Sequence, residues 1–375
     1  MVRIGHSPDL PIGSDTQGIP KLPALPTQAL RLLKSTHRVT KVTALGGGHG
    51  LYGSLSALRH VTTDLTAIVT VADDGGSSGR LRKEMGVLPP GDLRMALSAL
   101  CDDTDWGRTW RDVMQHRFSA PEGYNDEFPL EYHALGNLLI TTLWQLLEDP
   151  VAGLDWAGAL LNARGRVLPM ALDPMVIYGT VLREHAGGGI ERVRISGQVN
   201  LSKEKQVHDI GLTPKDARPC PEALTAIEES DWVILGPGSW RTSVLPHLLL
   251  EAQRDVICRT EAMRCVVMNL SDDEETAGFT PAAHLALLKR YAPDLRLDAV
   301  IADDETPKSV RSELERESES MGARVMWAPV RASAENNVHN PLKLAAAYHE
   351  LFSSFRGKER GIYFLFMPPQ DTPFL

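Results

Sequence analysis

The sequence predicts an α/β protein with a mostly parallel sheet and helices on both of its faces. Short apolar runs such as residues 42–45 and 232–235 alternate along the chain with helical patterns, which is typical of βαβ units. A glycine-rich run at 46–50 follows one apolar run, and an acidic turn at 73–76 follows the next. Ligands of such sheets bind beyond the carboxyl ends of the strands, so both loops are candidate binding sites.

The individual elements follow from the same patterns. β-branched or apolar runs bounded by turn residues predict strands, which we place at 42–45, 66–72, 232–235, 265–270, 297–302 and 324–327. Helical spacing of apolar residues predicts helices, which we place at 51–59, 93–100, 134–147 and from about residue 244.

The 375 residues divide into three regions: a proline-containing N-terminal arm at 1–38, an α/β domain at 39–356 and a C-terminal tail at 357–375.

The net charge of −9 argues against general affinity for nucleic acid, which needs basic surface. Four scattered cysteines without a C-x-x-C pair fit a reducing compartment and argue against a zinc knuckle. No apolar stretch approaches the ~18 residues of a membrane span. We expect a cytoplasmic protein that forms a homo-oligomer.

The first candidate loop is glycine-rich and lies between a predicted strand and a predicted helix. Glycines let a backbone approach a phosphate closely, and the helix that follows points amide groups at it. Part of the run matches G-x-G-x-x-G, a weak signal that its position strengthens. A tight turn without a ligand is the alternative. The candidate residues are Gly46, Gly47, Gly48, His49 and Gly50.

The second candidate loop is the acidic turn after the next predicted strand. Asp73 or Asp74 could hold ribose hydroxyls, or both carboxylates could bind magnesium beside phosphates. The residues that follow add hydroxyl and amide donors and one positive side chain: Ser77, Ser78, Gly79 and Arg80. The alternative is a solvated Asp-Gly turn.

Two later segments carry polar residues near predicted helix starts. Asp92 stands at the expected N-cap of a helix, and capping is the simpler interpretation for it. Arg94 in the first turn opposes the helix dipole, a cost that an anionic ligand would offset. Gly136 lowers helix propensity, while Asn137 can recognise a base or ribose through a donor and an acceptor. His133 is more simply a structural histidine than a catalytic one.

A third strand-to-helix junction lies in the later part of the predicted sheet. Its hydroxyl groups could bind phosphate oxygens or cap the helix, and capping explains one of them rather than all. The candidates are Gly236, Pro237, Gly238, Ser239, Thr242 and Ser243. Asn269 follows another predicted strand and precedes a further acidic segment that ends at Glu275 and Thr276.

Taken in order, these motifs resemble the YvcK/CofD-like family. The resemblance covers roughly residues 40–350 and rests on the runs at 68–80, 89–94, 135–138 and 236–239. It is closer to the YvcK branch, often called the gluconeogenesis factor. It implies a Rossmann-like three-layer fold and a site for a nucleotide or nucleotide-sugar, with UDP-N-acetylglucosamine the ligand associated with this branch. It also implies a role in cell shape and envelope synthesis during gluconeogenic growth, whereas the CofD branch contains a magnesium-dependent 2-phospho-L-lactate transferase.

The chain departs from the family pattern at several positions. His49 replaces a usual threonine, His247 a usual asparagine, and Phe279 a common tyrosine whose hydroxyl is therefore missing. The acids at 272–274 also replace less acidic residues. These changes concern the sugar end of a ligand more than its phosphate end.

Three functions remain open at this point. The first is a non-catalytic regulator that binds a nucleotide-sugar, because no nucleophile and base stand at a readable spacing. The second is a magnesium-dependent transferase of phosphorylated conjugates. The third is an NAD-dependent oxidoreductase, which rests only on the G-x-G-x-x-G match and the acid after it.

Overall fold

The computed structural model describes residues 39–124, 126–184, 189–204, 206–270, 279–333 and 336–356. The expected N-terminal arm, the C-terminal tail and the acidic segment at 271–276 lie outside the described residues. No helix in the described part of the chain is long and apolar enough to cross a membrane.

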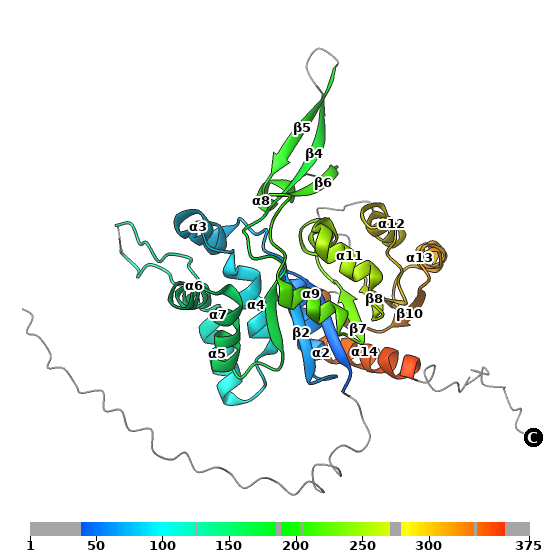
Figure 1. The fold of residues 1–375 in the computed structure, drawn as a ribbon, viewed down its shortest axis with the longest axis horizontal. Helices are drawn as coiled ribbons and strands as arrows, with labels where there is room; N and C mark the ends of the chain where they lie inside the picture. Colours follow the sequence, from blue (N-terminus) through cyan, green and yellow to red (C-terminus); the bar gives the residue numbers. More distant parts are fainter. Residues whose placement is uncertain are drawn as a thin grey trace, which may run out of the picture. The chain divides into compact units, whose positions relative to one another are not determined.

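A seven-stranded parallel sheet forms the centre of the domain (Figure 1). Its order is β10-β9-β8-β7-β1-β2-β3. The strands are β1 (Lys41–Gly46), β2 (Asp64–Val69), β3 (Arg166–Pro169), β7 (Trp232–Leu235), β8 (Met263–Val267), β9 (Ala299–Asp303) and β10 (Arg324–Ala328). The chain runs outward from β1 to β3, returns, and runs outward the other way from β7, so the topological switch point lies between β1 and β7. All six predicted strands are present, and the predicted mostly parallel sheet is confirmed.

Helices cover both faces of this sheet. α2 packs against α4 and α14, while α9 packs against α11 and α12 against α13, as right-handed crossovers on either side of a switch point require. The helices of the domain are α2 (Gly48–Leu58), α3 (Gly76–Met85), α4 (Pro90–Leu100), α5 (Asp105–Gln115), α6 (Leu135–Leu147), α7 (Pro150–Leu160), α9 (Pro221–Glu228), α10 (Pro246–Leu249), α11 (Glu251–Arg259), α12 (Pro281–Tyr291), α13 (Lys308–Ser320) and α14 (Pro341–Arg356).

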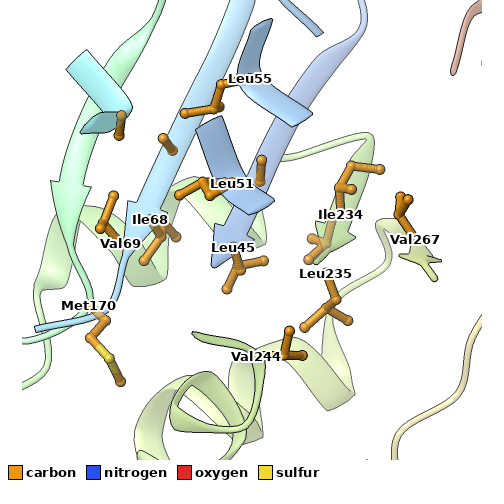
Figure 2. Packing of buried hydrophobic residues seen from close by; sticks show 14 of the residues in the cluster. Leu45, Leu51, Leu55, Ile68, Val69, Met170, Ile234, Leu235, Val244 and Val267 are labelled. Atoms are coloured by element: carbon orange, nitrogen blue, oxygen red, sulfur yellow. The ribbon is translucent and has the colours of Figure 1, made fainter. Parts of the chain in front are cut away.

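The core is continuous across the central strands. Leu45, Ile68 and Ile234 come from three neighbouring strands and have no exposed surface, and Figure 2 shows them grouped with Leu51 and Leu55 of α2. Parallel strands that are buried on both faces carry unbroken apolar runs rather than alternating ones. This rigid centre holds the loops at the carboxyl edge in place.

A second, antiparallel sheet is inserted between β3 and β7 and was not predicted. It has the order β5-β4-β6, with β4 (Val176–Glu184), β5 (Ile190–Ser196) and β6 (His208–Thr213), and the short α8 (Gln198–Leu201) lies between β5 and β6. A small hairpin of β11 (Arg331–Ser333) and β12 (Asn336–His339) precedes α14. Most of β5 is exposed, so its sequence lacks the alternation that a half-buried strand shows.

Three predicted boundaries were wrong in ways that matter for the site. α2 begins at Gly48, within the glycine loop, rather than at residue 51. β2 ends at Val69, so four residues without regular structure separate it from Asp74. The helix expected from residue 244 begins earlier, as a π-helical turn, η1 (Trp240–Val244).

Candidate functional site

The glycine loop after β1 contacts the loop after β7. A Cβ atom on Gly50 would overlap the backbone of Pro237 and Gly238, so only glycine permits this approach. Gly238 has φ +138°, a conformation that side chains rarely adopt. The structure therefore brings two of the predicted loops together at the switch point.

Asn269 links the loop after β7 to the end of β8. Its Oδ1 accepts a hydrogen bond from the Gly238 N–H (2.9 Å), and its Nδ2 donates to the Gly238 carbonyl (3.0 Å). The side chain thus pairs with the loop as a neighbouring strand would. Asn269 therefore lies beside the paired loops and acts on the loop backbone.

The hydroxyl residues of the second loop form the cap of η1. Ser239 is the N-cap, and its Oγ accepts from the Thr242 N–H (3.2 Å) and from the Thr242 hydroxyl (2.8 Å). Capping therefore accounts for two of the three hydroxyls, not for one as expected. The Ser243 hydroxyl instead faces the first loop, 3.4 Å from where a Cβ on Gly47 would lie.

Asp92 joins α4 to the glycine loop, and its expected role as N-cap was wrong. Proline is preorganised for the first position of a helix, so α4 begins at Pro90 with Pro89 as its N-cap. The Asp92 carboxylate accepts from the Thr70 hydroxyl (3.3 Å) and from the Gly48 N–H. It therefore lies at the N-terminus of α2, where a bound anion would otherwise sit.

Two carboxylates meet beside α4. Burial raises the pKa of Asp92 to about 7, and the nearby Asp73 carboxylate adds to that shift against the bonds from Thr70 and Gly48. Burial also raises the pKa of Asp73, against hydrogen bonds from Gly75 and Ser78. Two acids that both hold protons more tightly than in water indicate a place where added positive charge is favourable.

The two aspartates of the acidic turn point to different partners. Asp73 accepts from the Gly75 N–H at 2.9 Å. Asp74 accepts from the Val199 N–H at 3.1 Å, and its carboxylate packs so closely on Gly197 that a Cβ there would overlap it. Asp74 thus connects the antiparallel insert to the acidic turn. The carboxylate that lies beside Asp73 is instead that of Asp92, near the start of α4.

A buried hydrogen-bonded chain connects α3, α4 and α6. Arg94 Nε donates to Asn137 Oδ1 (2.9 Å), and Asn137 Nδ2 donates to Ser77 Oγ (3.0 Å), which lies 3.0 Å from His133 Nδ1. Burial, with the positive charges of nearby arginines, lowers the pKa of His133. Sequence reasoning took His133 as structural and could not pair it with Ser77, 56 positions away.

Arg94 is placed differently from the prediction. It is the fifth residue of α4, beyond the first turn, where the helix dipole has little effect. Its guanidinium is buried and donates to the amide oxygens of Asn137 and Gln115. Gly136 makes room for it, since a Cβ there would lie 2.9 Å from Arg94 Cδ. Arg94 therefore orients Asn137, and its predicted place in the first turn of the helix was wrong.

The remaining predicted residues line the edges of this region. Arg80 donates to the Glu131 carbonyl, and Gly79 lies against the Asp74 carbonyl, where a Cβ would overlap it. His49 is exposed. Phe279 stacks on His284 (centroids 5.8 Å apart), which stacks on Trp240 of η1 (4.8 Å).

The described residues alone do not complete a metal site here. In the described part of the chain no group of three or more His, Cys, Asp or Glu side chains could hold one. Asp73 and Asp92 supply two carboxylates, and magnesium commonly takes one or two carboxylates together with phosphate oxygens and waters. The residues present therefore fit magnesium bound jointly with a phosphorylated ligand.

A separate cavity of about 340 Å³ lies at the opposite, amino edge of the sheet. Lys41, Asp64 and Arg166, the first residues of β1, β2 and β3, line it together with residues of α9. None of the predicted site residues borders it, so it is distinct from the site at the carboxyl edge.

The fold and the paired loops define a doubly wound α/β protein with a glycine-lined site at its topological switch point. Residues 42–337 match the family model described as 2-phospho-L-lactate transferase CofD. The chain belongs to the CofD family, as its motifs led us to expect.

Relatives support the same assignment. A protein of Mycobacterium leprae is 44% identical over 310 residues, which cover 82% of this chain and 84% of the relative. The Gluconeogenesis factor of Bacillus subtilis is 35% identical over 281 residues, 74% of this chain and 83% of the relative. The crystal structure of a UPF0052-family member from Bacillus halodurans has a TM-score of 0.70 and 31% identity, covering 83% of this chain and 99% of that one.

Proposed function

We propose that the protein binds a nucleotide or nucleotide-sugar diphosphate, such as UDP-N-acetylglucosamine, at the carboxyl edge of the sheet. The observation that carries the proposal is the contact of Gly50 with Pro237 and Gly238. It joins two glycine loops, each followed by a helical turn that begins close to the loop, and the positive end of a helix dipole favours anions. Such a pair suits a diphosphate, which has anionic oxygens on both sides.

The carboxylates of the site make a cation part of the proposal. A diphosphate beside Asp73 and Asp92 would be repelled unless positive charge intervened. Magnesium held by these two residues and by phosphate oxygens would neutralise both. We therefore assign the metal to Asp73 and Asp92, with Asp74 holding the insert, in place of the pair Asp73 and Asp74.

Relatives named gluconeogenesis factor support the metabolic part of the proposed biological role. We propose that ligand binding serves to regulate carbon metabolism, cell shape and envelope synthesis during growth on gluconeogenic carbon sources, in the cytoplasm. We also propose a homo-oligomer, because Trp106 and Trp156 are 54% and 63% exposed and tryptophan is enriched at protein interfaces. Light scattering of the purified chain would give the oligomeric state.

Calorimetric titration with UDP-N-acetylglucosamine, GDP and NAD, with and without magnesium, tests the ligand. We expect tight, magnesium-dependent binding of the nucleotide-sugar without turnover. Gly50→Ala should abolish binding, because its Cβ separates the two loops. Gly53→Ala is the matched control, since a Cβ there meets nothing within 4 Å. Absence of nucleotide binding in the parent, or unchanged binding by Gly50→Ala, would refute the proposal.

A magnesium-dependent transferase is the second candidate, and the pairing of Ser77 with His133 favours it. Asn137 donates to Ser77 Oγ, which leaves the serine proton free to be donated to His133 Nδ1, 3.0 Å away. A lowered histidine pKa keeps the ring neutral and able to accept that proton, which is the arrangement of a hydroxyl with a general base. Formation of any product from a phosphorylated nucleotide conjugate, lost in Ser77→Ala, would favour this candidate.

A further inference from the structure

A fully buried histidine lies beneath the glycine loop. His247 of α10 has no exposed surface, and its Nε2 lies 3.2 Å from the Gly46 carbonyl oxygen. Its Nδ1 lies 2.8 Å from Nε2 of Gln253, which is also fully buried on α11. The ring therefore connects a helix of the second half of the domain to the first residue of the loop.

The protonation of this ring follows from its partners. A carbonyl oxygen can only accept, so the proton must be on His247 Nε2. Nδ1 of the neutral ring is then an acceptor, and the Gln253 amide supplies the matching donor. Gln253 thus fixes the tautomer that allows His247 to hold Gly46.

Holding the Gly46 carbonyl has a consequence for the next amide. That oxygen also accepts from the Thr70 N–H at 3.0 Å, so two donors fix its direction. The Gly46–Gly47 peptide is not among the cis bonds of the described chain, and in a trans peptide the C=O and N–H groups point opposite ways. The Gly47 N–H is therefore directed away from His247. Gly47 is the N-cap of α2, whose N–H is one of the donors without a partner inside the helix.

We infer that His247 is a positioning residue that aims the Gly47 N–H at a phosphate of the bound nucleotide, with Gln253 fixing the tautomer that this requires. The inference rests on the proposed function. His247 contacts the loop at the Gly46 carbonyl oxygen and acts on the ligand only through the Gly46–Gly47 peptide. An apolar residue of similar size would fill the space but leave the Thr70 N–H as the one remaining donor of the two that fix the direction of the Gly46 carbonyl.

Calorimetric titration with UDP-N-acetylglucosamine, together with thermal unfolding, tests this role in the full chain. His247→Leu removes the donor and should weaken binding about tenfold, the value of one well-directed bond to a charged group. His247→Gln restores an N–H at a similar reach and should bind within about threefold of the parent. His60→Leu, which replaces an exposed histidine after α2, is the matched control and should bind like the parent.

Gln253→Leu keeps the inference testable if His247→Leu fails to fold, because Gln253 does not touch the loop. It should weaken binding by a similar factor, and the double variant should bind no more weakly than His247→Leu, because the two residues act in series. A lower Tm with an unchanged Kd in both single variants would overturn the inference and show a purely structural role. Absence of binding by the parent would instead refute the proposed function, and the inference would fail with it.

Discussion

Asn269 and Gly238 form a two-bond pair in which one side-chain amide takes the place of a neighbouring strand. Gly238 donates to Oδ1 at 2.9 Å and accepts from Nδ2 at 3.0 Å. The pair fixes the loop after β7 from β8, while the contact with Gly50 fixes it from the side of β1. The site is thus held by three adjacent strands of the parallel sheet.

Asn269→Ala should loosen this loop. Loss of two hydrogen bonds lowers the free energy of unfolding by about 1–3 kcal/mol, and binding of UDP-N-acetylglucosamine should weaken as well. Chemical denaturation and calorimetry measure the two effects. Unchanged stability and affinity would show that the pair does not hold the loop.

Asp92→Asn should make the protein more stable in mild alkali. The folded pKa of about 7 exceeds the ordinary 3.8, so the parent loses stability as the pH rises from 3.8 through 7. The neutral variant avoids this loss, which we expect to be on the order of 4 kcal/mol near pH 8. Urea unfolding of both proteins at acidic and alkaline pH measures it. Equal pH dependence in the two proteins would contradict the raised pKa.

The variants Asp73→Asn and Asp74→Asn should distinguish the metal-binding role proposed for Asp73 from the structural role proposed for Asp74. We expect magnesium to raise the Tm of the parent and of Asp74→Asn in the presence of UDP-N-acetylglucosamine, but not that of Asp73→Asn. Asp74→Asn should instead speed hydrogen exchange of the Val199 N–H, because that amide loses a charged acceptor. If the magnesium-dependent rise in Tm is instead lost only in Asp74→Asn, Asp74 rather than Asp73 is the metal ligand.

Buried histidines should destabilise the protein in acid. Burial lowers the pKa of His247, His284 and His339 to about 4, from an ordinary 6.5. Their neutral forms contribute stability that is full above pH 6.5 and is lost as the pH falls toward 4, by up to about 1.4 kcal/mol per pH unit for each group. His284→Phe keeps a ring between Trp240 and Phe279 but cannot titrate. Its stability should fall less steeply than that of the parent over this range, and an equal slope would exclude His284 as a contributor.

Gly136→Ala should disturb the buried chain of hydrogen bonds. The added Cβ lies 2.9 Å from Arg94 Cδ and 2.7 Å from the Met114 carbonyl, and overpacking of this kind costs about 1–3 kcal/mol. A Cβ on Gly53 meets nothing within 4 Å, so Gly53→Ala should not lower the free energy of unfolding and can even raise it by stabilising α2. Thermal unfolding of both variants checks the contrast, and equal Tm values would show that Arg94 adapts freely.

The local sequence was enough to place the strands and the loops. β7 coincides with the apolar run at 232–235, and β1 extends the run at 42–45 by one residue at each end. The insert of β4 to β6 was missed although β4 is buried at alternate positions, because β5 is mostly exposed and has no buried residue. Asp92 was predicted to be an N-cap from its neighbours in the sequence alone. Its contacts with Thr70 and Gly48 could not be predicted, because both residues are distant from it along the chain.

The sequence by itself determined the sheet, its parallel strands and the positions of the glycine and acidic loops, because these depend on hydrophobic pattern and turn chemistry over a few residues. Only the tertiary structure decided which side chains share the site. The pairings of Asp73 with Asp92 and of Ser77 with His133 join distant positions of the long connection between β2 and β3, whereas that of His247 with Gly46 joins two different crossovers. Such pairings arise only when helices, loops and strands pack together in the folded domain, and no local interaction encodes them.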